Sequence, residues 1–202
     1  NHEKLFHVIK GHLFIMVKEP NPGRVKTRLG RSIGMTNAAW WFRHNAQSLI
    51  RKLSADTRWK TILAVSPDIG GLTSRVWPNH LPRWPQGGGD LGSRMGNIFR
   101  NAPKGPIVII GADIPNIKPG FINDAFDALG NHEAVVGPAL DGGYWLIGLK
   151  RGATPIPNLL FKGVCWSSET TLSDTLNSLG ANKVKHIVQL RDVDTVDDLY
   201  HF

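Results

Sequence analysis

The stretch EAVVGPALDGGYWLIGL, residues 133–149, holds two short apolar runs that are typical of buried β-strands. The runs EAVVGP (133–138) and YWLIGL (144–149) are joined by a few residues, whereas a parallel crossover needs about a dozen or more. We therefore expect two antiparallel strands, which makes any sheet that contains them mixed. Tyr144 and Trp145 are adjacent in the second run, so we expect their side chains on opposite faces of it.

Strand-like and helix-like segments alternate on both sides of this stretch. Apolar runs rich in β-branched residues predict strands, and apolar residues that recur every three or four positions predict helices. The expected strands are 12–17, 61–66, 106–113 and 186–190, and the expected helical faces are 39–53, 121–129 and 172–179. The Pro- and Gly-rich segment 67–90 is expected to be a long irregular loop. This alternation predicts a three-layer, Rossmann-like α/β sandwich with a mixed, mostly parallel sheet.

Length and composition favour one soluble domain. The 202 residues, 41% of them hydrophobic, are enough for one sizeable core, so we expect a single domain over 1–202. The one cysteine, Cys165, argues against a disulfide framework or a multi-cysteine metal cluster and fits a reducing compartment. Charges interrupt the apolar run in the first twenty residues, and no stretch approaches the roughly 18 apolar residues of a membrane span. We expect a cytoplasmic protein without a membrane span.

The formal net charge of +8 favours an anionic partner. Nucleic acid, an acidic membrane surface and a phosphorylated small molecule all fit that charge. Nucleic-acid-binding modules usually gather their basic residues on one helix or stripe, whereas Lys and Arg are dispersed along this chain. We therefore favour a small phosphorylated substrate. A nucleic-acid-binding module and a catalytically silent scaffold remain alternatives.

A stiffened basic loop follows the first predicted strand. The sequence KEPNPGRVKTRL (18–29) places Arg24, Lys26 and Arg28 two residues apart after a Pro/Gly-rich bend. Because Val25 precedes Lys26 and Thr27, the loop is not a P-loop. A basic loop alone is often solvated surface. In an open α/β sheet, however, ligands bind beyond the carboxyl ends of the strands, so we predict that this loop binds phosphates.

Carboxylates follow three other predicted strands. Asp113 ends the run PIVIIGAD, Asp141 precedes two glycines between the antiparallel strands, and Asp192 and Asp194 follow the last run. Each has a local alternative: Asp113 can cap a turn, the glycines can serve a tight turn, and TVDD (195–198) matches a capping box that Asp192 or Asp194 could serve. Cations in one loop and carboxylates in others suit a phosphate ligand held with Mg²⁺ or Mn²⁺. We predict Asp113, with Asp192 or Asp194, as the metal ligands.

Six motifs in order resemble a bacterial glycosyltransferase-like family of the nucleotide-diphosphosugar transferase superfamily. They are GRVKTRL (23–29), GGDLGSRM (88–95), IGADIP (110–115), GPALDGGYWLIGL (137–149), CWSSE (165–169) and RDVDTVDDL (191–199). The resemblance spans almost the whole chain. It implies the A-type glycosyltransferase fold, a Rossmann-like sandwich that binds a nucleotide with a divalent metal.

The sequence departs from this pattern at the expected metal motif. Glycosyltransferases of this fold usually hold the metal with an Asp-x-Asp pair, but Pro115 stands two residues after Asp113. The chain is also similar to the nucleotidyltransferases that make molybdopterin dinucleotide or activate phospholactate. In RDVDTVDDL, which resembles their late motif, Val196 stands where Pro is usual and Asp197 where Glu is usual. The resemblance therefore implies a metal-dependent transferase that uses a nucleotide, with glycosyl transfer first and nucleotidyl transfer as the alternative.

We assign roles to the motif residues on this basis. Asp141 is predicted to bind the sugar or acceptor or to act as base, and Lys26 to stabilise the leaving phosphate. In GGGDLGSRM, Asp90 or Ser93 is expected to cap the next helix. The full predicted set is Arg24, Lys26, Thr27, Arg28, Gly89, Asp90 and Gly92 for the nucleotide, Asp113, Asp192 and Asp194 for the metal, and Asp141, Gly142, Gly143, Tyr144 and Trp166 for the second substrate.

Overall fold

The computed structural model describes residues 9–152, 155–180 and 183–201. Within them, seven strands form one sheet in the order β3-β2-β1-β4-β6-β5-β7. The strands are β1 (His12–Lys18), β2 (Lys60–Ser66), β3 (Arg83–Pro85), β4 (Ile107–Gly111), β5 (Ala134–Pro138), β6 (Tyr144–Leu149) and β7 (Val184–His186). The helices are α1 (Thr27–Ile33), α2 (Met35–Ser54), α3 (Asp68–Thr73), α4 (Leu91–Asn101), α5 (Pro119–Asn131), α6 (Thr171–Leu179) and the 3₁₀ turn η1 (Asp197–His201).

The sheet is mixed because one strand runs against the others. β1 is parallel to β2 and β4, and β2 and β5 have the parallel partners β3 and β7. β6 is antiparallel to both of its neighbours, β4 and β5. The antiparallel pair expected within 133–149 is therefore confirmed, and so is the fold class.

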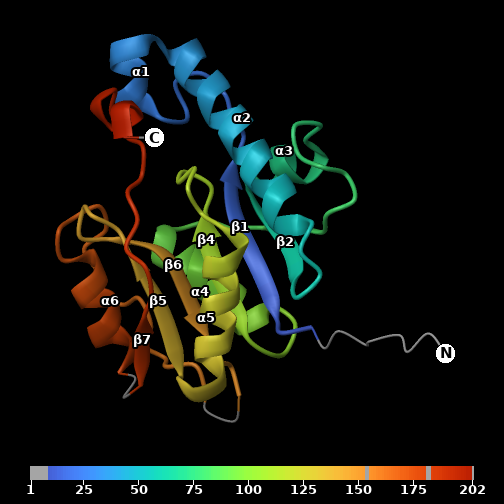
Figure 1. Cartoon of the computed structure of the whole chain (residues 1–202), viewed down its shortest axis with the longest axis vertical. Coiled ribbons are helices and arrows are strands. Elements are labelled where there is room, and N and C mark those ends of the chain that lie inside the picture. The colour runs from blue at the N-terminus through green and yellow to red at the C-terminus, as the bar shows by residue number, and fades with distance from the viewer. Residues whose placement is uncertain (1–8, 153–154, 181–182, 202) are drawn as a thin grey trace.

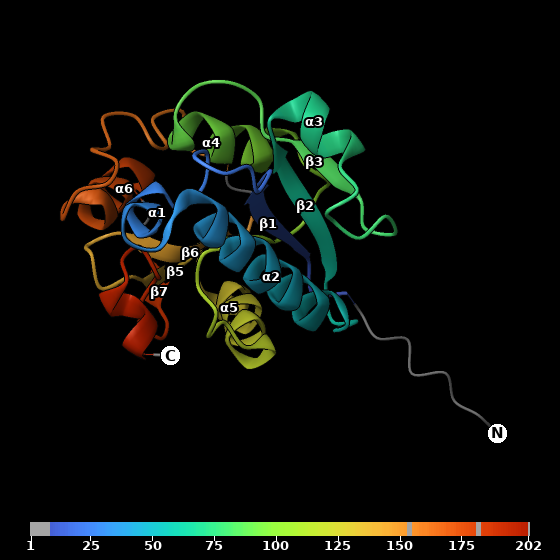
Figure 2. The same ribbon diagram turned by 90° about the horizontal axis from the view of Figure 1, so that it is seen from above.

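Helices cover both faces of the sheet, which gives three layers (Figures 1 and 2). The apolar stripes of α2 and α5 pack with Leu13, Ile15 and Val108 in one core. The helices α4 and α6 pack with Phe14 and Ile109 in a second core on the opposite face. Alternate residues of β1 thus enter different cores, as the period of two along a strand requires. Tyr144 and Trp145 likewise enter the second and the first core, as expected.

A small third core fixes the C-terminal segment beside the loop after β1. Leu29 of α1, Ala38 of α2 and Val193 are buried together, and Val196 and Leu199 pack against them. Figure 1 shows α1 and the C-terminal turn η1 side by side, at the end of the sheet where β1 ends. This packing brings the basic loop and the RDVDT motif to one edge of the sheet.

Two segments differ from the expectation. The stretch 67–90 contains α3 and the edge strand β3, because β3 pairs with β2 over Leu63 to Val65, a contact that local sequence does not indicate. The last strand spans 184–186 and not 186–190. The β5–β7 pairing ends at Val136 and His186, and beyond it an isolated parallel bridge joins Ala139 and Leu190, in which Leu190 N–H donates to Pro138 O (3.1 Å) and Leu140 N–H donates to Leu190 O (3.2 Å).

Two further expectations concern export and membranes. Residues 1–8, which belong to the first twenty residues on which the expectation of a cytoplasmic protein partly rests, lie outside the described residues. Among the helices within 9–152, 155–180 and 183–201, none combines the length and the apolar character needed to cross a bilayer.

Candidate active site

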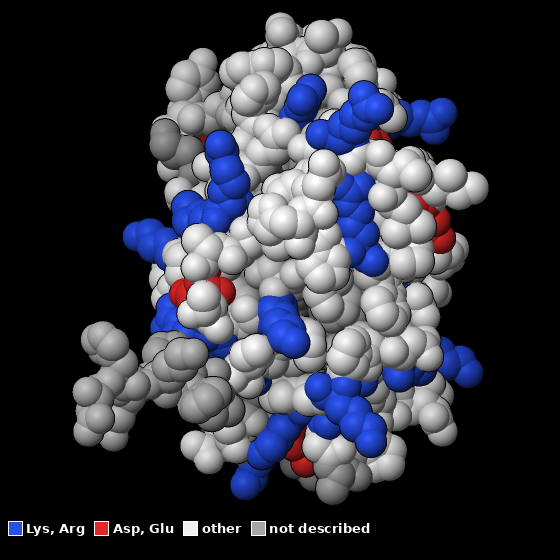
Figure 3. Space-filling view, turned by 90° about the vertical axis from the view of Figure 1, so that its right-hand side faces the viewer, with Lys and Arg blue, Asp and Glu red and all other residues white. Residues whose placement is uncertain are grey.

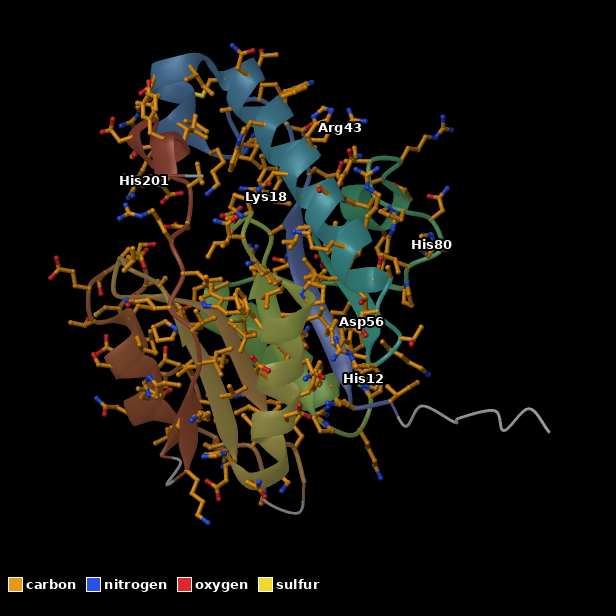
Figure 4. All side chains as sticks on the ribbon, viewed as in Figure 1. His12, Lys18, Arg43, Asp56, His80 and His201 are labelled. Atoms are coloured by element: carbon orange, nitrogen blue, oxygen red, sulfur yellow. The ribbon has the colours of Figure 1, made fainter. Side chains whose placement is uncertain are left out.

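A cavity of about 610 Å³ lies at the carboxyl edge of the parallel strands. Residues from the ends of β1 and β4 and from the C-terminal segment line it, and so does Tyr144 at the start of β6. β6 presents its first residue here because it runs antiparallel to β4. Figure 4 shows Lys18, a lining residue, at this end of β1 and His12 at the other end. The position agrees with the rule that α/β sheets bind ligands beyond the carboxyl ends of their strands.

Lys26 is the buried cation of this cavity. Its side chain is 4% exposed, and its Nζ lies 2.8 Å from Asp194 and 3.2 Å from Asp113. The backbone of Lys26 has φ 46° and ψ 46°, a left-handed conformation that side-chain-bearing residues rarely adopt, at the N-terminal boundary of α1. An ammonium has three donors. Two carboxylates accept from this one, so one donor remains for a ligand in the cavity.

The two carboxylates keep Lys26 charged. Burial by itself would lower the pKa of Lys26, but Asp113 and Asp194 outweigh it and raise that pKa above its ordinary value. Hydrogen bonds fix the loop that carries Lys26: Glu19 N–H donates to Ser66 O at 2.8 Å, and the Glu19 carboxylate accepts from Trp77 Nε1 at 2.8 Å. Trp77 is itself buried. The loop is thus held in place before any ligand arrives.

The RDVDT segment adds two carboxylates with different surroundings. Burial, followed by the charges of Asp194 and Asp141, raises the pKa of Asp192, and Lys26 only partly offsets this. Asp198, and neither Asp192 nor Asp194, serves the turn at the start of η1: its Oδ2 accepts from the N–H groups of Asp194 (3.0 Å) and Thr195 (2.8 Å). The side chains of Asp192 and Asp194 therefore line the cavity and do not cap η1.

The charges that line the cavity favour a bound cation. Five carboxylates line it against three cations, which leaves two negative charges in excess although the whole chain carries +8. The carboxylates are Asp90, Asp113, Asp141, Asp192 and Asp194, and the cations are Lys18, Arg24 and Lys26. Among the described residues, no group of three or more acidic, His or Cys side chains could by itself hold a metal ion. The arrangement therefore does not fit a closed cage, but it fits Mg²⁺ or Mn²⁺ bound by one or two carboxylates together with substrate phosphates and water.

Asp90 joins two segments that are distant in sequence. Its Oδ1 accepts from Ser93 N–H at 2.8 Å, which caps α4, and its Oδ2 accepts from Trp166 Nε1 at 3.1 Å. Hydrogen bonds from Ser93 and Trp166 lower the pKa of Asp90. Of the two capping candidates, Asp90 is therefore the cap. Gly92 allows the same contact, because a Cβ there would lie 2.6 Å from the Trp166 ring and 2.7 Å from Phe161 Cβ.

The CWSSE segment and the start of α6 form a further part of the cavity wall. Trp166, Ser167, Ser168 and Thr171 line the cavity. The hydroxyl of Thr171 donates to Cys165 O at 2.7 Å, which holds the segment against α6. The Asp-Gly-Gly turn packs beside it: Gly142 has φ 88°, and a Cβ there would lie 2.5 Å from the backbone of Glu169. Only glycine fits this position on both counts.

The predicted site residues separate into two groups. Those that the structure gathers around the cavity are Arg24, Lys26, Asp90, Asp113, Asp141, Gly143, Tyr144, Trp166, Asp192 and Asp194. Those outside its lining are Thr27, Arg28, Gly89, Gly92 and Gly142. Gly92 and Gly142 allow close packing of segments, as described above. Arg28 is 70% exposed, with one nitrogen 3.7 Å from Asp194.

Several lining residues were not singled out from the sequence. Gln86 is buried and donates to Val17 O (3.2 Å) and Ala64 O (2.8 Å), so it joins β1 and β2 at the cavity floor. Its Oε1 accepts from Arg94 at 3.3 Å. The GGDLGSRM motif, which contains Arg94, was the one sequence signal that pointed to this part of the cavity. Gln86 itself stands in the segment expected to be an irregular loop.

Comparisons with known proteins agree with the fold. The model of a family described as "Uncharacterized protein conserved in bacteria (DUF2064)" matches residues 49–168. A crystal structure from Desulfovibrio desulfuricans G20, described as a candidate nucleotide-diphospho-sugar transferase, is 28% identical with a TM-score of 0.81, over 95% of this chain and 85% of that chain. No curated protein matches the sequence.

Two more distant structures share the fold alone. Glucosyl-3-phosphoglycerate synthase from Mycobacterium tuberculosis, in complex with Mn²⁺, UDP and glucosyl-3-phosphoglycerate, is 13% identical, with a TM-score of 0.52 over 94% of this chain and 74% of that chain. CMP:2-keto-3-deoxy-manno-octonic acid synthetase with CTP is 8% identical, with a TM-score of 0.59 over 95% of each chain. The expected superfamily is confirmed, and its structural neighbours include both kinds of transferase.

Proposed function

The chain belongs to the DUF2064 family, and from that premise and the cavity described above we propose that it is a divalent-metal-dependent transferase that transfers a glycosyl group from an NDP-sugar. The observation that carries the proposal is the position of Lys26. Its ammonium lies between Asp113 and Asp194 at the edge where nucleotides bind in this fold. Lys26 is a cation held in place before a ligand binds, and the carboxylates beside it carry more negative charge than the nearby cations balance. This arrangement suits a diphosphate held together with a metal ion.

The phosphates are assigned to the basic side of the cavity. Lys18, Arg24 and Lys26 line it, and all three come from β1 and the loop that follows. In glycosyl transfer, negative charge develops on the diphosphate as it leaves the sugar. Cations held in place before the reaction stabilise that charge without reorganising. Arg28 lies on the exposed surface near Asp194, and we assign it to the outer rim of the site.

The metal is assigned to the carboxylates that the basic loop faces. Asp113 and Asp194 lie next to the same ammonium, and Asp192 shares their cavity. Asp113, with Asp192 or Asp194, would hold Mg²⁺ or Mn²⁺ together with phosphate oxygens. A bound divalent ion would neutralise part of the charge of the departing diphosphate.

Asp141 is assigned to the attacking hydroxyl. The residue is exposed and lines the cavity, and its Oδ1 accepts from Gly143 N–H at 3.0 Å, which orients the carboxylate. In the proposed reaction the acceptor oxygen forms a bond to the anomeric carbon, the bond from that carbon to the phosphate oxygen breaks, and its electron pair leaves with the NDP. The proton of the acceptor hydroxyl passes to Asp141.

Nucleotidyl transfer is the second candidate. Asp113 has no Asp-x-Asp partner, and RDVDTVDDL resembles the late motif of nucleotidyltransferases. In that reaction the acceptor would attack the α-phosphorus of an NTP and pyrophosphate would leave. What supports glycosyl transfer instead is the wall of Trp166, Tyr144 and Asp141, because an aromatic surface with a carboxylate suits a sugar ring.

Binding to nucleic acid has less support. Figure 3 shows the Lys and Arg side chains of one face separated by uncharged residues and not gathered in a continuous stripe. The polar and charged groups described above converge on a concave cavity, which suits a small ligand.

The test is to incubate the purified protein with Mn²⁺ and a panel of NDP-sugars and NTPs, and to measure NDP and pyrophosphate separately. We expect slow hydrolysis of, or transfer from, at least one NDP-sugar, with NDP released and no pyrophosphate from any NTP. Pyrophosphate release that depends on an added phosphorylated acceptor, with no NDP formed from any sugar nucleotide, would select nucleotidyl transfer instead.

A further inference from the structure

The cations that line the cavity all come from one short segment of the chain. Lys18, Arg24 and Lys26 come from residues 18–26, at the end of β1 and in the next loop. A second group of lining residues, which we call the hydroxyl wall, consists of Asp141, Tyr144, Trp166, Ser167, Ser168 and Thr171. In the sheet, β4 separates β6, which begins at Tyr144, from β1. Within the part of the chain that the structure describes, no Lys, Arg or His that follows Lys26 in the sequence lines the cavity.

One cation of the sequence motifs, Arg191, is paired outside the cavity lining. Arg191 precedes Asp192, but its guanidinium pairs with Asp198 at 3.4 Å, and Arg191 does not line the cavity. The carboxylates of Asp141 and Asp192 add negative charge beside the hydroxyl wall. A phosphate group placed there would meet like charge without a compensating cation, and like-charge contacts strongly disfavour binding.

The polar groups of the hydroxyl wall suit a neutral ligand instead. Ser167 has φ 56°, an uncommon backbone conformation for a residue with a side chain, and it is an exposed residue of the cavity lining, so a ligand can reach its hydroxyl. Asp141 uses Oδ1 for the Gly143 N–H. A serine hydroxyl and a carboxylate oxygen can together bind a substrate hydroxyl, one as donor and one as acceptor.

Resting on the proposed function, we propose that the hydroxyl wall binds an uncharged, hydroxyl-bearing second substrate and selects against a phosphorylated one. The nucleotide donor supplies the only phosphates of the reaction, and they bind on the side of Lys26. The acceptor contributes a free hydroxyl near Asp141. Its oxygen forms the new bond to the anomeric carbon, and its proton passes to the Asp141 carboxylate as described above.

The test uses ligand-detected NMR on the protein with Mg²⁺ and saturating UDP or GDP, so that the nucleotide occupies the basic side. Two matched pairs are titrated: glucose against glucose 6-phosphate, and glycerol against glycerol 3-phosphate. We expect the neutral member of at least one pair to bind at least ~10-fold more tightly than its phosphorylated partner, since like charge next to Asp141 is unfavourable.

A charge introduced at the wall should reverse this preference. Ser167→Lys should tighten glucose 6-phosphate at least ~5-fold relative to the wild type, because it supplies the missing cation. The matched control is Glu169→Lys, which removes an exposed acid two residues away and outside the cavity lining. We expect it to leave the glucose 6-phosphate affinity within about 2-fold of the wild type, since an exposed charge outside the cavity lining interacts only weakly through solvent.

Several outcomes would overturn the inference. One is tighter binding of the phosphorylated member of both pairs in the wild type. Another is the absence of saturation transfer from all four probes while UDP or GDP is bound. Equal changes of the glucose 6-phosphate affinity in Ser167→Lys and Glu169→Lys would also overturn the inference. If neither UDP nor GDP binds, the proposed function fails for those nucleotides, and the comparison of the two lysine variants still tests the wall on its own.

Discussion

The ammonium of Lys26 lies 2.8 Å from a carboxylate oxygen of Asp194, although 168 positions of sequence separate the two residues. The same ammonium lies 3.2 Å from Asp113. One buried cation thus joins the loop after β1, the loop after β4 and the C-terminal segment. Loss of Lys26 would leave the carboxylates of Asp113 and Asp194 without the cation that they share.

Lys26→Met should weaken NDP binding by about 1–3 kcal/mol, the range for a lost hydrogen bond to a charged group. Isothermal titration in the presence of Mn²⁺ measures this. Arg31→Met is the matched control, because Arg31 is an exposed cation of the same helix and does not line the cavity. Equal affinity of the wild type for a nucleoside and for its diphosphate would contradict the assignment of Lys26 to phosphate.

Asp113→Ala should abolish metal-dependent nucleotide binding and leave the fold intact. The residue follows β4, but its side chain is 50% exposed at the cavity and contributes nothing to the cores. Thermal-shift titration of an NDP with and without Mn²⁺ reports both properties, because a ligand that binds only the native state raises its stability. The control Asp197→Ala removes an exposed acid outside the cavity lining. An unchanged Mn²⁺ effect in Asp113→Ala would exclude Asp113 as a metal ligand.

Asp192→Asn should stabilise the metal-free protein at neutral pH. Burial and the charges of Asp194 and Asp141 raise the pKa of Asp192, so the folded state binds this proton more tightly than the unfolded chain does. Ionisation of Asp192 therefore costs stability as the pH rises through the carboxyl range, and the cost remains at pH 7. Removing the charge should raise the Tm by about 1–3 °C after allowance for solvent screening.

The difference in stability between Asp192→Asn and the wild type should depend on pH. The advantage of Asp192→Asn over the wild type should disappear at acidic pH, where Asp192 is protonated in both folded and unfolded protein. The variant should also lose part of the stabilisation that Mn²⁺ and nucleotide give to the wild type. Thermal unfolding between pH 3 and about 8 measures both. A metal-free variant less stable than the wild type at pH 7 would contradict the assigned charge penalty.

Gly92→Ala should destabilise the fold by about 1–3 kcal/mol, the usual cost of overpacking. Its Cβ would lie 2.6 Å from the Trp166 ring and 2.7 Å from Phe161, so the CWSSE segment must move away from α4. The matched control is Gly130→Ala in α5, where a Cβ meets nothing within 4 Å. That change should stabilise the protein by about 0.5–1 kcal/mol, the helix-propensity gain of Ala over Gly. Urea unfolding measures both, and equal effects would contradict the packing role of Gly92.

Local sequence pattern was enough to predict most of the architecture. The short connection between the two apolar runs of 133–149 indicated the antiparallel pair, and the repeats at three and four positions indicated α2, α5 and α6. The cations of the basic loop and the aspartates at strand ends indicated one charged edge, because the topology of a parallel sheet brings successive strand ends together. These features depend on neighbours in sequence, so a single chain displays them.

Tertiary contacts decided what the pattern left open. Asp198 and not Asp192 or Asp194 serves the turn of η1, because Val193 and Leu199 join the small core with Leu29 and turn the chain there. The short strand β3 exists because it pairs with β2, and Asp90 meets Trp166 because Gly92 lets the two segments approach.

The pairing of Lys26 with Asp194 and the separation of the cations from the hydroxyl wall also depend on folding. Both relate residues far apart in the chain, whose distance is set by the packing of helices and strands between them. The sequence by itself determined which charged groups the protein has and which strands carry them. Only the folded structure decided which of these groups meet, because electrostatic and packing energies depend on distance in space and not on separation along the chain.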